Sequence, residues 1–253
     1  MQANAAPGPE SIINVLQFGS PVDAERLVRE FLQHEPASEN GLILLGMCLT
    51  QQSRMAEAIS VLRNLTLLVP ESAVHWGNLG TALRRAGEVC EAEQAYRRAI
   101  ELDPKFADAL VDLGYLLLES GRYPEARDTF LAAHAADPAS PEARIYAAKT
   151  CVALDDRELA SRLIAPRHGW SELSDALTLE LASLMTASGS ADEGVQIYEE
   201  FLRRNPDSAR AMANLVILYE RINRLDDAQK LLQRLPPAES IDDPELQYDV
   251  NTA

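Results

Sequence analysis

The stretch LGTALRRAGEVCEAEQAYRRAIELDP, residues 79–104, decides the fold of this 253-residue chain. Its apolar residues fall at helical spacing on both sides of Gly87, for example at Ala92 and Tyr96. Glycine suits a turn between two helices, because it adopts left-handed backbone conformations without strain. Pro104 follows the second helical stretch and ends it, because proline has no N–H to donate. The stretch therefore predicts a pair of amphipathic helices joined by a glycine turn.

The same pattern recurs with a period of 34 residues. One column holds prolines, with Glu172 in the place that they skip: Pro36, Pro70, Pro104, Pro138 and Pro206. A second column holds small residues of the second helix: Ala24, Ala58, Ala92, Ala126, Ala160, Gly194 and Ala228. A third, mostly of small residues, lies in the first helix: Gly46, Gly80, Gly114, Ala148, Ala182 and Val216. A fourth lies between the helices: Gly19, Ser53, Gly87, Gly121, Asp155, Gly189 and Asn223.

Each column has a physical reason. The fourth holds residue types that suit a turn or a left-handed helix cap. The small residues inside the helices let two helices approach closely. Because one helical hairpin cannot bury its apolar face alone, neighbouring hairpins are expected to stack into a solenoid.

Eight residues of the third unit resemble the signature of the tetratricopeptide repeat family: Trp76, Leu79, Gly80, Leu83, Ala92, Tyr96, Ala99 and Pro104. Leu83 departs from that signature, which often has tyrosine there. The fourth unit is similar through these residues: Leu113, Gly114, Ala126, Phe130, Ala133 and Pro138. The resemblance implies an all-α, right-handed superhelical solenoid of antiparallel helix pairs, whose first helices line a concave groove that binds peptides or other proteins.

The resemblance covers about residues 10–240 as seven units, with these approximate spans: 10–38, 39–72, 73–106, 107–140, 141–174, 175–208 and 209–240. We expect residues 1–9 to be a disordered N-terminus, and residues 241–253 to be an acidic linker followed by the start of a further helix. The fifth unit is degenerate, because Pro166 and Gly169 interrupt its second helix. We expect that helix to end early, before a loop in which Trp170 either contacts a partner or fills the gap left by the short helix.

Composition limits the classes of function. Alanine and leucine dominate and aromatic residues make up only 6%, which favours helices over sheets. The net charge of −16 would repel a nucleic-acid backbone. Cys48, Cys90 and Cys151 are too far apart for a metal site and odd in number, so we interpret them as small buried residues in a reducing compartment. With neither a signal-peptide pattern near Met1 nor an apolar run long enough for a membrane span, we expect a cytoplasmic protein.

The sequence predicts neither catalysis nor a cofactor nor a metal. None of the four histidines has a histidine or cysteine partner at ligand spacing, and His134 near a helix end suits the helix dipole. Acidic pairs such as Asp155–Asp156 lie at turns, where they cap helices. Nucleophile-elbow, phosphate-loop and dinucleotide motifs are missing from the sequence.

The groove implied by the resemblance is the candidate site. The predicted partner-binding residues are Ile43, Met47, Asn78, Arg84, Val111, Tyr115, Leu118, Ile145, Lys149, Leu179, Asn214 and Ile217. Their apolar members suggest a strip that binds a protein or peptide segment, although each could instead pack inside the solenoid. Lys149 is the sole lysine in the set, which argues against the lysine–asparagine carboxylate clamp of some relatives. The acidic chain favours a partner with apolar anchors and basic flanks.

Two functions remain open from the sequence. The first is a non-catalytic scaffold that binds a protein or peptide in the groove. The alternative is the N-terminal substrate-recruiting arm of a larger bacterial enzyme, of sulfotransferase, glycosyltransferase or oxygenase type, with its catalytic domain beyond residue 253. The repeat phase favours continuation, because Ala253 falls about a third of the way into an eighth unit.

Overall fold

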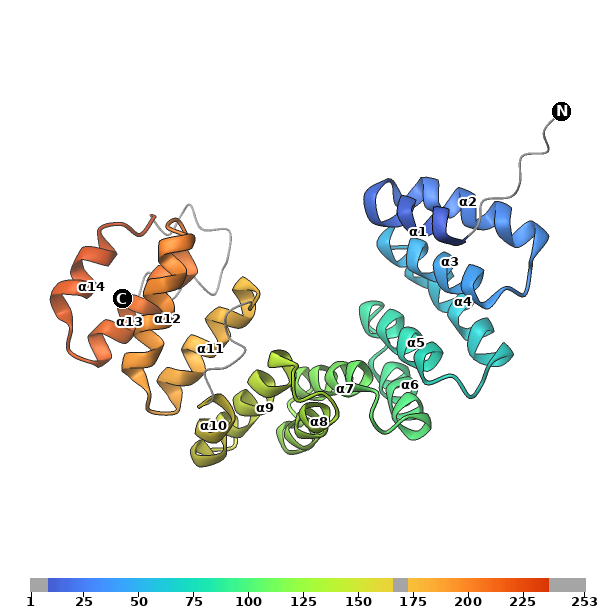
Figure 1. The fold of residues 1–253 in the computed structure, drawn as a ribbon. Coiled ribbons are helices and arrows are strands. Elements are labelled where there is room, and N and C mark those ends of the chain that lie inside the picture. Colours follow the sequence, from blue (N-terminus) through green and yellow to red (C-terminus); the bar gives the residue numbers. More distant parts are fainter. Residues whose placement is uncertain (1–8, 166–172, 237–253) are drawn as a thin grey trace. The chain divides into compact units, whose positions relative to one another are not determined.

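The computed structural model describes residues 9–165 and 173–236, and in these ranges the chain is all-α, with fourteen helices and no strand (Figure 1). The first helices of the pairs are α1 (Pro9–Phe18), α3 (Glu39–Gln51), α5 (Ala73–Arg85), α7 (Ala107–Glu119), α9 (Pro141–Ala153), α11 (Asp175–Ala187) and α13 (Ala209–Arg221). The second helices are α2 (Pro21–His34), α4 (Met55–Leu68), α6 (Val89–Leu102), α8 (Tyr123–Ala136), α10 (Arg157–Ile164), α12 (Ala191–Arg204) and α14 (Leu225–Leu232). The expected fold class is confirmed.

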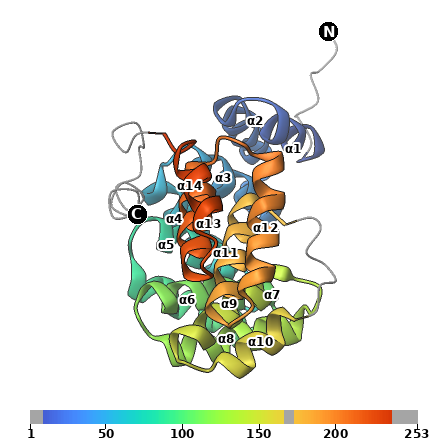
Figure 2. The ribbon, with the colours of Figure 1, turned by 90° about the vertical axis from the view of Figure 1, so that its left-hand side faces the viewer.

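The chain divides into two compact units, the first ending at Ser120 and the second beginning at Gly121. The first unit holds α1 to α7 and the second holds α8 to α14. Within each unit, every helix packs against the next one along the chain (Figures 1 and 2). First helices also contact each other: α5 contacts α7, and α9 contacts α11. The helices α3 and α5 approach each other less closely.

The column between the helices has the predicted left-handed backbone. Six of its seven members have positive φ, from +59° to +99°: Ser53, Gly87, Gly121, Asp155, Gly189 and Asn223. A Cβ at Gly87 would meet nothing within 4 Å, so its backbone angle, rather than crowding, favours glycine there. The backbone thus turns the same way in successive hairpins, which repeats the pairing of helices.

The small residues inside the helices permit the close contacts predicted for them. A Cβ at Gly80 would lie 2.7 Å from the ring of Tyr96, which is fully buried. In the second helices, Ala92 and Ala126 have no exposed surface. These contacts hold the two helices of a hairpin together.

Two second helices are shorter than the rest. Five second helices have 14 residues, but α10 and α14 have eight each. The predicted early end in the fifth unit is confirmed, since α10 ends at Ile164, two residues before Pro166. The predictions for residues 1–8, for the loop with Trp170 and for residues 241–253 lie outside the described residues.

Capping bonds explain where several helices begin. The Ser140 and Ser208 side chains accept hydrogen bonds from backbone N–H groups in the first turns of α9 and α13. Asp156 accepts from Leu159 N at 3.1 Å, which confirms its predicted capping role. His134 differs from its expected role, because burial and then the Arg144 charge lower its pKa and favour the neutral imidazole.

Candidate functional site

Two polar pairs join neighbouring first helices at equivalent positions of the repeat. In the first unit, Thr81 Oγ1 of α5 donates to Asp112 Oδ2 of α7 at 2.8 Å. In the second unit, Lys149 Nζ of α9 lies 2.9 Å from Glu180 Oε1 of α11. The partners of each pair are 31 residues apart, and the second pair follows the first by two repeat periods. We call these two positions of the repeat the bridge positions.

Other groups support both pairs. The Tyr96 hydroxyl donates to Thr81 Oγ1 at 3.3 Å, and burial raises the pKa of Tyr96 to about 12, so it remains a donor. Arg84 lies 3.7 Å from Asp112 and 3.5 Å from Glu119, measured between nitrogen and carboxylate oxygen. In the second unit, the Lys149 ammonium lies 5.4 Å from the centre of the Tyr146 ring. The side chains at these bridge positions are therefore engaged within the protein.

At an equivalent position in the first unit, the bridge is replaced by a pocket. Met47 of α3 and Asn78 of α5 occupy the bridge positions and lie on its wall. The pocket, which we call the α3–α5 pocket, has a volume of about 270 Å³ and is lined by Ile43, Gly46, Met47, Thr50, Gln51, Leu62, Asn78, Thr81, Ala82 and Arg85. Met47 is 47% exposed, so an apolar side chain is accessible there. This site combines an apolar wall with amide, hydroxyl and guanidinium groups.

A smaller pocket lies at the same repeat position in the second unit. Ser183 of α11 and Asn214 of α13 occupy its bridge positions. This α11–α13 pocket has a volume of about 160 Å³ and is lined by Ser183, Thr186, Ala187, Tyr198, Asn214, Ile217, Leu218 and Arg221. Every one of these residues lies four repeat periods after a residue of the α3–α5 pocket. Threonine, asparagine and arginine recur in both, whereas serine replaces Met47.

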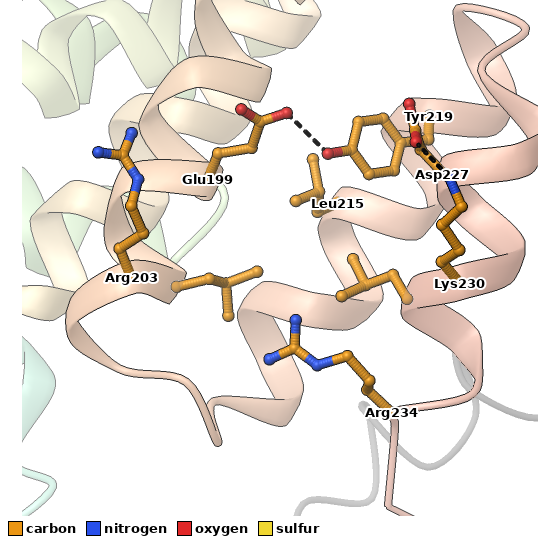
Figure 3. A pocket seen from close by; sticks show the side chains of 9 residues that line it. Glu199, Arg203, Leu215, Tyr219, Asp227, Lys230 and Arg234 are labelled. Atoms are coloured by element: carbon orange, nitrogen blue, oxygen red, sulfur yellow. Dashed lines mark hydrogen bonds and ion pairs between the residues drawn. The ribbon is translucent and has the colours of Figure 1, made fainter.

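A third pocket, in the second unit, is formed by other surfaces (Figure 3). This α12–α14 pocket has a volume of about 340 Å³ and is lined by Glu199, Leu202, Arg203, Leu215, Tyr219, Asp227, Lys230, Leu231 and Arg234. The Tyr219 hydroxyl donates to Glu199 Oε1 at 2.8 Å across its upper wall, as Figure 3 shows. Burial, followed by the bonded Glu199 carboxylate, raises the pKa of Tyr219. Nothing in the repeat pattern of the sequence predicted this pocket.

Family models match the chain in two places. Tetratricopeptide repeat models match residues 78–141 and residues 185–248, which together make up about half of the chain. The helix pairs, the left-handed turns and the small-residue columns are those that this repeat requires. The chain belongs to the tetratricopeptide repeat family.

Solved structures share the fold of this tetratricopeptide repeat protein. A protein from Pseudomonas aeruginosa, pilF, superposes with a TM-score of 0.68 at 17% identity, over 80% of this chain and 92% of that one. A tetratricopeptide repeat protein from Parabacteroides merdae gives 0.65 at 17% identity, over 96% and 95%. YrrB, described as having an unusual peptide-binding site, gives 0.60 at 20% identity, over 76% and 98%. At these identities the likeness shows the fold alone.

No curated protein matches the sequence. No helix in the described ranges is long and apolar enough to cross a membrane. Within those ranges, histidine, cysteine and acidic side chains form no group that could hold a metal ion.

The structure brings some of the predicted groove residues of this tetratricopeptide repeat protein together. Ile43, Met47 and Asn78 line the α3–α5 pocket, and Asn214 and Ile217 line the α11–α13 pocket. The remaining predicted residues line neither pocket: Arg84, Val111, Tyr115, Leu118, Ile145, Lys149 and Leu179. Most of these are half-buried, as are Val111, Tyr115 and Leu118 on α7.

The prediction that Ile145 contacts a partner is wrong. Ile145 has no exposed surface and packs in a core cluster with Leu181 and Met185 of α11, so a partner cannot touch it in this conformation. The interpretation of the cysteines also needs correction, because Cys90 is exposed while Cys48 and Cys151 are buried. Burial raises the pKa of both buried thiols to about 11, which keeps them protonated and unreactive.

The sequence prediction missed residues that complete both pockets. Arg85 and Arg221 lie at equivalent places in the two pockets, and Leu62 and Tyr198 of the second helices do too. A different signal was available for the bridge positions themselves, because the two residues of each bridge are 31 residues apart in the sequence. Comparing residues at that spacing distinguishes a bonded pair such as Lys149–Glu180 from an unbonded one such as Met47–Asn78.

Proposed function

We propose that this chain is a non-catalytic scaffold that holds a protein or peptide segment against its first helices, with one side chain of that segment in the α3–α5 pocket. Repeats of this family are typical of protein–protein interaction, and the fold is generally non-catalytic. The observation that carries the proposal is the contrast between bridged and unbridged positions. Where Thr81–Asp112 and Lys149–Glu180 bond, the protein satisfies its own polar groups, whereas Met47 and Asn78 leave a pocket.

The lining of the α3–α5 pocket suggests what enters it. Ile43, Met47 and Leu62 supply apolar surface, which favours an aliphatic or aromatic anchor on the partner. The Asn78 amide has both donor and acceptor atoms, so it can bond a partner's backbone in either sense. YrrB is described as a peptide-binding member of the same fold, which is consistent with a peptide ligand.

The charge of this chain bears on the flanks of the partner's segment. Basic flanks follow from the net charge of −16, which attracts cationic segments and speeds their association. Arg85, however, lies on the pocket wall itself and would repel a cation placed next to the anchor. The proposal therefore places basic residues of the partner away from the anchor.

The test fills the α3–α5 pocket with a polar pair that this protein already has at an equivalent position. Peptides selected from a display library against the full chain would be measured by fluorescence anisotropy. The double substitution Met47→Lys with Asn78→Glu installs the Lys149–Glu180 pair at the equivalent position. We expect it to weaken binding by about 5- to 150-fold, since losing an anchor contact costs about 1–3 kcal/mol, while the helical content stays unchanged.

A matched control makes the same change elsewhere. Ser183→Lys with Asn214→Glu installs the bridge in the α11–α13 pocket with the same effect on net charge. We expect this control to change affinity by less than about twofold. If the control weakened binding and the α3–α5 variant did not, the anchor site would be wrong; if neither did, neither pocket between first helices would hold an anchor of the segment.

A further inference from the structure

The α3–α5 pocket has an apolar part and a polar part. Ile43 and Met47 line its α3 wall, and Gln51 lies on the same wall as the last residue of that helix. On α5, Asn78 lies near the middle of the helix, and Arg85 is its last residue. The apolar surface and the guanidinium group therefore lie at different places in one pocket.

The charge of Arg85 is not neutralised by an ion pair within the described ranges. The pocket lining contains no aspartate or glutamate, and no carboxylate pairs with Arg85 among residues 9–165 and 173–236. The neighbouring Arg84, by contrast, lies 3.7 Å from Asp112 and 3.5 Å from Glu119. Arg85 suits the negative end of the α5 helix dipole, but this interaction leaves its N–H groups free to donate. The exposed guanidinium can therefore pair with a carboxylate of a ligand.

An arginine recurs at this repeat position beside the other open pocket. Arg221 lies four repeat periods after Arg85 and lines the α11–α13 pocket. It too has no ion pair with any residue that the structure describes. The bridged pairs have other residues at this position, namely Glu119 on α7 and Ala187 on α11. An arginine without an ion pair thus occurs where the bridge is missing, once in each unit.

Helix geometry indicates how far apart the two parts of the α3–α5 pocket are. An α-helix rises about 1.5 Å per residue, so Met47 and Gln51 are about 6 Å apart along α3, and Asn78 and Arg85 about 10 Å apart along α5. Two residues of an extended chain span about 7 Å, and their side chains point the same way. An extended segment also has free backbone groups for the Asn78 amide, whereas those of a helix are bonded internally. A carboxylate two residues from the anchor can therefore reach Arg85.

Building on the proposed function, we propose that the α3–α5 pocket selects an extended segment with an aspartate or glutamate two residues from its apolar anchor. The anchor packs against Ile43, Met47 and Leu62, and the carboxylate accepts hydrogen bonds from the Arg85 guanidinium. Basic residues of the segment lie farther from the anchor, where the net charge of −16 attracts them.

Paired substitutions in the protein and the peptide test this contact. Alanine scanning would identify the anchor of each display-selected peptide, and fluorescence anisotropy would measure its affinity for the full chain. We expect an acidic residue two positions from the anchor. Replacing that residue by the matching amide should weaken binding to the parent about fivefold. Arg85→Gln should weaken binding of the acidic peptide by about the same factor, and the amide peptide should then show no further loss.

Arg26→Gln is the matched control, because Arg26 is an exposed arginine of α2 without an ion pair in the described ranges. It should change affinity by less than about twofold and keep the preference for the acidic peptide. Arg85→Glu should reverse that preference, so that a peptide with lysine in place of the acidic residue binds better than the acidic peptide. Circular dichroism would verify that each variant is folded.

Two results would overturn the proposal. One is an equal ratio of the two affinities, for the acidic and the amide peptide, in the parent and the Arg85→Gln chain. The other is a loss of affinity on amidation of the peptide's C-terminus with none on replacement of the acidic side chain, which would assign the carboxylate to the chain end.

Failure of the proposed function gives a different result. In that case, Met47→Lys with Asn78→Glu leaves the affinity unchanged. If that variant weakens binding and Arg85→Gln does not, the anchor site stands and only the acidic contact is wrong.

Discussion

Gly80 of α5 packs directly against the ring of Tyr96 of α6, so closely that a Cβ at residue 80 would lie 2.7 Å from two ring carbons. Tyr96 is fully buried, so its ring cannot move into solvent to make room. The contact sets the separation of the two helices in the hairpin that the sequence pattern first indicated.

Gly80→Ala should therefore destabilise the protein. Overpacking costs about 1–3 kcal/mol, and the better helix propensity of alanine returns up to about 1 kcal/mol. Urea denaturation should show a net loss of about 1–2 kcal/mol in the free energy of unfolding. Gly80→Ala should cost less in a Tyr96→Leu background than in the parent, because the ring that clashes is gone. Strictly additive effects of the two substitutions would show that the contact does not set the helix separation.

Ser53 and Gly87 occupy the same left-handed position of the repeat and should respond to substitution in opposite directions. Their φ angles are +60° and +82°. Gly87→Ala should lower the free energy of unfolding by about 1 kcal/mol, because an L-residue is strained there. Ser53→Gly should raise it by up to about 1 kcal/mol, because strain is relieved. Changes of the same sign in the two variants would contradict a common left-handed turn.

Glu25 of α2 should make stability depend on pH. Burial alone would raise its pKa, but hydrogen bonds from Gln52, Arg29 and Arg54 outweigh burial and hold it below the usual 4.5. A carboxyl whose pKa is lower in the folded state stabilises the fold above its unfolded-state pKa. That contribution is lost as the pH falls through the lower folded-state value, so the loss should begin near pH 4.5 and continue below it.

Comparison with Glu25→Gln isolates this group. The variant keeps the size of the side chain but cannot ionise. We expect its free energy of unfolding to be lower than that of the parent at neutral pH and to fall less steeply below pH 4.5. Urea denaturation across this pH range would measure both slopes. Parallel slopes would mean that other carboxylates, such as Glu57 and Asp227, whose pKa values are also lowered, account for the acid sensitivity.

Tyr115 of α7 tests whether the proposed binding surface extends beyond the α3–α5 pocket. The side chain is half-buried on the same unit. Tyr115→Ala should weaken binding of a selected peptide by about 1–3 kcal/mol if an aromatic contact is made there. Arg97→Glu on α6, where Arg97 pairs with Glu93, serves as the control and should have little effect. A loss of binding in the control alone would point to a surface formed by second helices.

The early end of α10 and the left-handed turns could be predicted from the sequence because their causes are local. Pro166 stops a helix through its own missing N–H. Gly87 adopts positive φ because it has no Cβ, and Asn223 does so because its short polar side chain tolerates that conformation. Because residues that end helices and form turns recur every 34 residues, the positions of the helix pairs can be predicted without knowing which distant residues are in contact.

Only the tertiary structure decided which positions of the first helices are open. Ile43 and Ile145 are the same residue at the same repeat position, yet Ile43 lines a pocket and Ile145 is fully buried. At the bridge positions beside Ile145, Lys149 and Glu180 bond across α9 and α11, whereas Met47 and Asn78 line a pocket beside Ile43. Apolar spacing along one helix predicts which face is apolar, but exposure depends on whether side chains of the neighbouring helix close over that face.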